Sequence, residues 1–397
     1  QEIFEYGNGR LAYHFVKDVE EQLKHYTPHY RELVAAAIVR AVDPKPLRLL
    51  NSRCEKLYLQ KKVPARLSPK HVSSVLKETG RNVRWWYQLF EGLAGDKLLL
   101  YDLTTVFTYS KNIRMAEKGY NSERKYNDQI GVVMAFSTED FLPVGMEVFW
   151  GSMKDITTIK DFLARFKADI GFILDRGFWS EELVKDFISE GISYVAPLRK
   201  NSHFMDMRWV RWRKPFTYRE RTIQWGKKKT ELGDLYFFYD PQLRGEEETA
   251  LLRRVEQGKM TMEEFEKEKR VAGVIGLLTN LDRSGMEVFE LYKSRQDVES
   301  AFDAMKNCLD SDKTYMHTDE AVRGYFFITF LALRIYFHVL RRLKEKELSS
   351  KISVNEVFFE LSKVQKIVEP TGREYYAKIP KKARKILEVF PEALHMG

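Results

Sequence analysis

The stretch of sequence that decides the fold covers residues 171–198 and reads GFILDRGFWSEELVKDFISEGISYVAPL. Its first run, GFILD, and its last run, ISYVAPL, are short and apolar and are bounded by turn residues, which is typical of buried strands. Between them, residues 180–190 carry apolar side chains at helical spacing. A strand, a helix and a second strand in this order predict an α/β layer in which helices pack on a mixed sheet.

More strands are expected on both sides of this stretch. Apolar, β-rich runs separated by turn residues occur upstream, in DKLLLYDLTTVFTYS at 96–110, QIGVVMAFSTED at 129–140 and LPVGMEVFWG at 142–151. They predict three adjacent antiparallel strands, followed by a helix at 157–169. Downstream, VAGVIGLLTNL at 271–281 has the pattern of another buried strand.

Changes in composition along the chain divide it into regions. The predicted regions are a helical N-terminal region at 1–95, an α/β domain at 96–202 and 271–319, a β-rich insertion at 203–270 and a helical C-terminal region at 320–397. In the first region, Ser68 and Pro69 mark a helix start, and Gly80 separates that helix from the next. Two helices across a tight turn fit a DNA-binding helix-turn-helix, but any antiparallel helix pair reads alike.

Basic and aromatic residues gather at the start of the insertion. Between residues 199 and 229, eleven Lys or Arg stand against two acids, so this segment alone matches the +9 excess of the whole chain. Its aromatic residues are Phe204, Trp209, Trp212, Phe216, Tyr218 and Trp225. Cations neutralise phosphates and flat rings stack on bases, so the segment predicts contact with nucleic acid. The alternative is an antiparallel sheet with a charged outer face and an aromatic inner face. The rest of the insertion reads as one charge-dense, solvated helix.

The composition narrows the class of protein. A chain of 397 residues exceeds the usual size of a single core, and 44% hydrophobic with 31% charged residues describes a globular protein without disordered tracts. Cys54 and Cys308 fit no metal-ligand spacing and indicate a reducing compartment. The first residues lack the pattern of a signal peptide. The apolar run 324–340 contains Arg334 and His338, so it predicts a buried helix and no membrane span. We therefore expect a cytoplasmic protein.

Three acids follow or flank the expected strands. Asp102 follows KLLLY and Asp175 follows GFIL, while Glu299 lies on the helix expected after the last strand. We expect these side chains to converge at one edge of the sheet, where grouped carboxylates repel one another unless cations neutralise them. Hard divalent ions suit such oxygen ligands, and a pair of ions can activate an attacking oxygen and stabilise a leaving one. Taken singly, Asp102 and Asp175 fit the capping of a turn or helix equally well.

Residues 291–307, LYKSRQDVESAFDAMKN, predict a helix with two neighbouring stripes. At about 100° per residue, the polar stripe spans roughly 60° of arc and consists of Tyr292, Arg295, Glu299 and Lys306. The apolar stripe, expected to face the core, consists of Leu291, Val298, Phe302 and Met305. An ordinary amphipathic helix with an ion pair between Arg295 and Glu299 would show the same pattern.

The segment YKSRQDVESAFDAMK matches Y-x2-R-x3-E-x6-K, and here the chain resembles the DDE transposases of bacterial and archaeal insertion sequences, the group often called the IS-four family. The segment YDLTT is similar to the strand that carries the first aspartate of that family, and LDRGFWS is similar to its second motif. The three motifs stand in the order of the family, over about residues 96–310. The 124 residues between Asp175 and Glu299 resemble members with a β-rich insertion.

The resemblance implies a ribonuclease H-like core, a mixed sheet with helices on both faces. It implies that Asp102, Asp175 and Glu299 hold two Mg²⁺ ions, for which Mn²⁺ can substitute. Arg295 and Lys306 would grip phosphates beside the scissile bond, and Tyr292 would donate to a phosphate oxygen. In relatives a Trp of the insertion holds a flipped base. The candidates for DNA contact here are Trp225 with Lys227 and Lys228, followed by Trp209 and Trp212.

The implied activity is cleavage by water at the ends of a mobile element, followed by attack of the freed 3′-hydroxyl on DNA. The implied partners are double-stranded DNA with terminal inverted repeats, target DNA and a second copy of the chain in the DNA complex. Excision through a DNA hairpin and other routes both stay open. One alternative is a ribonuclease H-like nuclease without strand transfer, and another is a domesticated DNA-binding protein without catalysis.

Overall fold

The protein is described by a computed structural model that covers residues 1–61, 63–95, 99–107, 113–118, 128–150, 171–174, 180–295 and 316–394, with the backbone alone for residues 100–107 and 118. Contacts between Cα atoms group the chain into two compact units. Unit 1 consists of Gln1–Gly95, Leu103–Ala168 and Ser300–Gly397, and unit 2 consists of Asp96–Asp102 and Asp169–Glu299.

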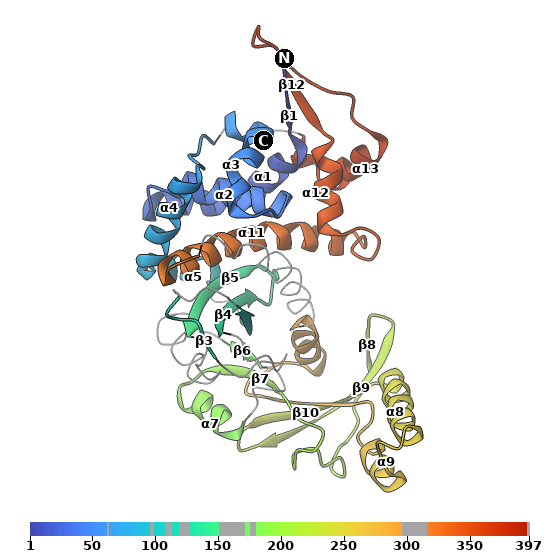
Figure 1. Ribbon diagram of the computed structural model, residues 1–397. Helices are drawn as coiled ribbons and strands as arrows, with labels where there is room; N and C mark the ends of the chain where they lie inside the picture. The colour runs from blue at the N-terminus through green and yellow to red at the C-terminus, as the bar shows by residue number, and fades with distance from the viewer. Residues whose placement is uncertain are drawn as a thin grey trace. The chain divides into compact units, whose positions relative to one another are not determined.

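The N-terminal region is mainly helical, as expected (Figure 1). Its helices are α1 Gly7–Tyr26, α2 Tyr30–Val42, α3 Leu50–Lys56, α4 Pro69–Arg81 and α5 Arg84–Ala94, with the 3-10 turns η1 Leu47–Leu49 and η2 Tyr58–Lys61. Pro69 takes the first position of α4, where its missing N–H costs nothing. Gly80 lies in the last turn of α4 and not between the helices, and α4 ends at Arg81.

A small antiparallel sheet joins the two ends of the chain, and none of its strands was predicted in the helical N-terminal and C-terminal regions. Its strands are β1 Glu2–Glu5, β12 Gln365–Val368 and β13 Glu374–Tyr376, in the order β1-β12-β13. All three strands are short and contain a single buried residue, Val368, so the sequence carries no buried run to mark them. Strands β1 and β12 pair across more than 350 residues, as between Glu2 and Val368, and β13 pairs with β12 nearby in the sequence.

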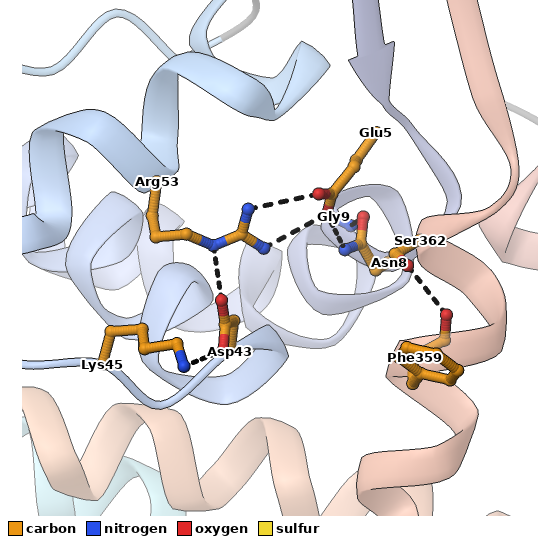
Figure 2. Close-up of polar contacts among 8 residues, drawn as sticks. All are labelled: Glu5, Asn8, Gly9, Asp43, Lys45, Arg53, Phe359 and Ser362. Carbon is orange, nitrogen blue, oxygen red and sulfur yellow. Dashed lines mark hydrogen bonds and ion pairs between the residues drawn. The ribbon is translucent and has the colours of Figure 1, made fainter.

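One guanidinium ties β1 to the helices (Figure 2). Arg53 of α3 donates from Nη1 and Nη2 to the two carboxylate oxygens of Glu5, at 3.2 Å each. Its Nε lies 2.7 Å from Asp43 Oδ2, and Lys45 Nζ lies 3.8 Å from Asp43 Oδ1. Asn8 of α1 donates from Nδ2 to Glu5 Oε2 at 2.7 Å. One network of ion pairs and hydrogen bonds thus connects β1 with α1, α3 and the end of α2.

The apolar run 324–340 lies within α11 Asp319–Glu345, a buried helix as predicted. Among the described residues, no helix is long and apolar enough to cross a membrane. Arg334 of α11 is only 4% exposed, donates from Nη1 to the carbonyl of Pro143 and lies 3.9 Å from Asp18. The C-terminal region continues with α12 Val354–Ser362, α13 Lys381–Val389 and the 3-10 turn η3 Pro391–Ala393.

The upstream strands form a sheet with β4 at its centre. The strands are β2 Leu99–Phe107, β3 Glu117–Lys118, β4 Asp128–Ser137 and β5 Pro143–Trp150. Strand β4 neighbours β2 and pairs antiparallel with both β3 and β5. Nearly every residue of β4 and β5 is buried, and α5 and α11 pack on β5. The predicted helix at 157–169 lies outside the described residues.

Unit 2 contains a six-stranded sheet in the order β6-β7-β11-β10-β9-β8. Its strands are β6 Gly171–Ile173, β7 Ser193–Pro197, β8 Phe216–Tyr218, β9 Arg221–Thr230, β10 Gly233–Tyr239 and β11 Val274–Thr279. Strands β6 and β7 are parallel and are connected through α7 Glu181–Ser189, and the other pairs are antiparallel. The predicted mixed α/β architecture is therefore confirmed.

The second half of the insertion forms two helices where one was predicted. They are α8 Pro241–Glu256 and α9 Met262–Lys269. Gly258 has a φ of +68°, and Thr261 with Glu264 forms a capping box that starts a new helix. None of the described residues of α8 is buried, which agrees with the predicted solvated character.

The helix expected at 291–307 starts earlier and is described over residues 285–295. Ser284 and Glu287 start it as a reciprocal cap. The Ser284 N–H donates to Glu287 Oε2 at 2.8 Å, and the Glu287 N–H donates to Ser284 Oγ at 3.3 Å. We call residues 285–295 the signature helix, because the Y-x2-R part of the motif lies on it.

Candidate functional site

Asp102 lies inside a strand and not at its end. Strand β2 runs from Leu99 to Phe107, so Asp102 is followed by five further strand residues. The β-rich run predicted at 96–110 does contain a strand, but the placement of Asp102 at the end of it is wrong, because the β-branched and aromatic residues Thr104 to Phe107 continue the extended backbone.

The second motif begins where β6 ends. Leu174 is 2% exposed and its N–H donates to Val195 O at 2.9 Å, which prolongs the parallel pairing with β7. Asp175 comes directly after this buried residue in the sequence, but it lies outside the described residues, as do Glu299 and Lys306. The predicted convergence of the three acids therefore stays a prediction.

An aromatic cluster fixes the signature helix to the sheet of unit 2. Phe289 is 1% exposed, and its ring centroid lies 5.6 Å from Phe216, 5.3 Å from Tyr218 and 5.0 Å from Phe238. This contact connects the helix to β8, which belongs to the basic and aromatic segment, and to β10, which follows that segment. One turn later, Tyr292 is partly exposed, within the Y-x2-R motif.

Trp225 of β9 packs against the start of the same helix. A Cβ on Gly285 would overlap the indole of Trp225, so only glycine fits there. The indole stacks on Tyr236 with centroids 6.1 Å apart and planes at 21°, and the guanidinium of Arg213 lies 4.9 Å from its centroid. Its Nε1 donates to Lys214 O at 3.2 Å. These contacts give Trp225 a packing role in the sheet.

The opposite face of the hairpin β9–β10 is covered by residues 207–213. Gly226 permits the close crossing, because a Cβ there would lie 2.8 Å from Val210. Trp209 packs on Phe237 at 5.2 Å and Trp212 on Tyr239 at 5.9 Å, and 42% of Trp212 remains exposed. Within the segment, β8 and β9 are thus antiparallel strands, but aromatic residues lie on both faces of the sheet, so the predicted division into a charged and an aromatic face is wrong.

The two candidate lysines differ in their surroundings. Lys227 Nζ lies 2.6 Å from Asp234 Oδ2 across the hairpin. Partial burial disfavours its charge, but hydrogen bonds with Asp234 and Tyr236 outweigh this, so the pKa of Lys227 lies above its usual value. Lys228 is exposed and its Nζ lies 5.1 Å from the Trp209 centroid. The other exposed cations of the segment include Arg211, Arg213, Lys214 and Lys229. The ion pair between Lys227 and Asp234 and the contact between Gly226 and Val210 could not be predicted from the sequence, because both depend on the register of the β9–β10 hairpin.

The two helices considered as a helix-turn-helix pack on α11. Trp85 and Trp86 of α5 are buried, with ring centroids 5.1 Å and 4.9 Å from Phe327. Helix α4 buries Val72, Val75 and Leu76 and also lies against α11. The apolar faces of both helices are therefore occupied within unit 1.

Comparison with known proteins finds a family match that encloses the strands β2 to β11 and the signature helix. Residues 94–335 match the family described as transposase DDE domain. No curated protein matches the chain. Among solved structures, the cryo-EM structure of the piggyBac transposase synaptic complex with hairpin DNA is similar at 13% sequence identity and a TM-score of 0.37, covering 91% of this chain and 76% of that one. Since the family match covers more than half of the chain, the protein belongs to the transposase DDE domain family and is a DNA transposase.

Proposed function

We propose that the protein cuts DNA at the ends of an insertion sequence and joins the freed 3′-ends to target DNA. The observation that carries the proposal is the family match over residues 94–335, which encloses all three motif acids. The proposed catalytic domain, residues 96–202 and 271–319, is a ribonuclease H-like core. The antiparallel strands beside β2 and the parallel unit β6-α7-β7 support it.

Asp102, Asp175 and Glu299 are the proposed metal-holding residues. Their donor atoms are carboxylate oxygens only, a set that fits Mg²⁺ or Mn²⁺ and not a soft metal. Two such ions, when bound, would activate the attacking oxygen and stabilise the leaving one. The side chains of this chain hold and orient the DNA: Arg295 and Lys306 grip phosphates, and the Tyr292 hydroxyl donates to a phosphate oxygen.

The surface at residues 207–229 is the proposed DNA-binding surface of the insertion. Its exposed cations neutralise phosphates, and Trp212 offers the ring face on which an extruded base can stack. We favour Trp212 over Trp225 because the indole of Trp225 already stacks on Tyr236 and packs on Gly285. Lys227 is held by Asp234, so Lys228 is the better phosphate ligand of the two candidates.

The test uses DNA ending in the inverted repeats that flank the gene. The wild type with Mg²⁺ should give cleaved and joined strands, and chelation of the metal should abolish both products. Cleavage should slow by about 1,000-fold or more in each of the variants Asp102→Asn, Asp175→Asn and Glu299→Gln. A loss of this size corresponds to the several kcal/mol of charge stabilisation that a bound metal supplies. DNA binding, measured by fluorescence anisotropy, should persist in all three.

Asp282→Asn is the matched control, because Asp282 is an exposed aspartate within the same family match. It should cleave like the wild type. Nicks without joined strands would favour the nuclease without strand transfer. Binding without any metal-dependent cleavage by the wild type would favour the non-catalytic DNA-binding protein.

A further inference from the structure

A cluster of metal-ligand side chains lies among the N-terminal helices of unit 1. His29, Glu32 and His71 each offer one ligand atom, and these atoms lie within 4.8 Å of one another. His71 Nε2 is 3.6 Å from Glu32 Oε1. A fourth group adjoins them, since Glu78 Oε2 is 2.6 Å from His29 Nε2. Two imidazoles and one carboxylate therefore meet at one place, and the carboxylate of Glu78 adjoins this group through His29.

Two helices supply these side chains in pairs. His29 is the N-cap residue of α2, and Glu32 lies in its first turn. His71 and Glu78 are seven residues apart on α4, a spacing that puts both on one face of the helix. The backbone holds the α2 pair in position, because Thr27 Oγ1 accepts from the His29 N–H at 3.2 Å and Glu32 Oε1 accepts from the N–H of Arg66 at 3.3 Å.

The ligand atoms are partly shielded but reachable from solvent. The side chains of His29 and Glu32 are 20% and 14% exposed, and that of His71 is 31% exposed. The imidazoles meet edge to face with centroids 6.0 Å apart. The Nε2 atom of each ring lies near a carboxylate, that of His29 near Glu78 and that of His71 near Glu32.

We propose that this cluster binds one Zn²⁺ ion through His29, His71 and Glu32, with Glu78 or a water as the fourth ligand. Imidazole nitrogens favour zinc over Mg²⁺, which prefers oxygen. Ligand atoms at tetrahedral positions around zinc lie about 3.3 Å apart, so small rotations of the side chains close the site. With neutral imidazoles, the two carboxylates cancel the charge of the ion. The bound ion clamps α2 to α4, and α4 packs on α11.

The experiment titrates metal-free, full-length protein with Zn²⁺ by calorimetry, with Mg²⁺ in excess so that the motif acids are not titrated. The wild type should bind one equivalent of Zn²⁺ and should gain thermal stability from it. His29→Gln and His71→Gln should each bind at least about 10-fold more weakly, since even changes around the ligands of a metal cost that much. They should also lose the thermal gain.

His25→Gln is the control, because His25 is an exposed histidine of α1 outside the cluster. It should bind Zn²⁺ like the wild type. Co²⁺ added to the wild type should give the intense visible absorption of a four-coordinate ion with nitrogen ligands, and His71→Gln should lose it.

Two results would overturn the proposal. One is Zn²⁺ affinity that stays unchanged in both His29→Gln and His71→Gln. The other is a Co²⁺ spectrum of the wild type with only the weak bands of six-coordinate Co²⁺, which decides the matter even if a variant fails to fold. Zn²⁺ binding that disappears in Asp102→Asn but persists in His71→Gln would assign the metal to the motif acids, and the pairs His29–Glu78 and His71–Glu32 would then be plain ion pairs.

Discussion

The imidazole of His338 on α11 is kept neutral by its surroundings. It stacks on Phe15 of α1 with centroids 4.9 Å apart and parallel planes. Burial, followed by the charges of Arg334 and Arg341, lowers the pKa of His338 to about 3. In the unfolded chain the pKa of a histidine is about 6.5. Below that pH the unfolded state therefore binds a proton that the folded state does not bind. The contribution of His338 to stability is therefore complete above the unfolded pKa and is lost as the pH falls from there toward the folded pKa.

His338→Gln should weaken the pH dependence of stability. Between pH 7.5 and 5.5, proton uptake by unfolded His338 lowers the free energy of unfolding of the wild type by about 1.4 kcal/mol, and the variant lacks this part. Urea unfolding at both pH values measures the difference. An unchanged slope in His338→Gln would mean that the imidazole is charged in the folded protein.

The tryptophans of the insertion should separate binding from stability. Trp212→Ala should cost about 1–3 kcal/mol of DNA-binding free energy, because the exposed part of its ring can stack on a base. Trp225→Ala should instead lower the free energy of unfolding by up to about 3 kcal/mol, because its partly buried ring leaves a gap beside Gly285. Anisotropy with single-stranded and inverted-repeat DNA and urea unfolding measure the two effects. The reverse assignment of effects would return the base-holding role to Trp225.

At the scale of elements, α4 and α11 approach each other backbone to backbone. A Cβ on Gly80 of α4 would overlap the Glu320 carbonyl of α11, and a Cβ on Gly324 of α11 would overlap the Leu76 carbonyl of α4. Each helix thus presents a glycine where the main chain of the other passes. This reciprocal fit explains two glycines in helix interiors, where each costs stability in isolation.

Gly80→Ala should therefore destabilise the protein. Forcing one methyl group into this contact pushes the helices apart, and overpacking of this kind costs typically about 1–3 kcal/mol. Gly92→Ala in α5 is the matched control, because its new Cβ would meet only Gln22 Oε1 at 3.5 Å. It should gain up to about 1 kcal/mol from helix propensity. Thermal and urea unfolding of both variants test the pair, and equal effects would show that the crossing tolerates a side chain.

The elements that could be predicted from the sequence are those with a continuous buried run. Strands β7 and β11 and helices α7 and α11 were predicted because burial marks their residues directly. The strands β1, β12 and β13 were missed, since β1 and β12 depend on each other across the length of the chain and β13 depends on β12. In the candidate site, the order of the three motifs led to the family. The ion pair between Asp234 and Lys227 and the packing of Trp225 could not be predicted, because they depend on the pairing between β9 and β10.

At the scale of the whole molecule, the basic excess of the chain equals that of residues 199–229, and part of it is paired. Lys200, Arg208, Arg221 and Lys227 form ion pairs with acids. The exposed cations described above remain on the surface of unit 2. The salt dependence of DNA affinity should therefore correspond to fewer phosphate contacts than the net charge suggests.

Lys228→Gln should reduce the slope of log affinity against log salt concentration by about 0.9, the effect of one phosphate contact on duplex DNA. Lys227→Gln should change the slope much less, because Asp234 already neutralises that ammonium. Anisotropy titrations at several salt concentrations measure both slopes. Equal reductions in the two variants would show that Lys227 leaves Asp234 when DNA binds.

Every residue of β11 from Val274 to Thr279 has a register partner in β10, and the signature helix begins six residues after β11 ends. Excising residues 203–270 to obtain a minimal enzyme would consequently strip a buried strand of its neighbour and leave an open, apolar edge that invites aggregation. The insertion is thus no detachable module, and shortened forms of this transposase should retain at least the β9–β10 hairpin.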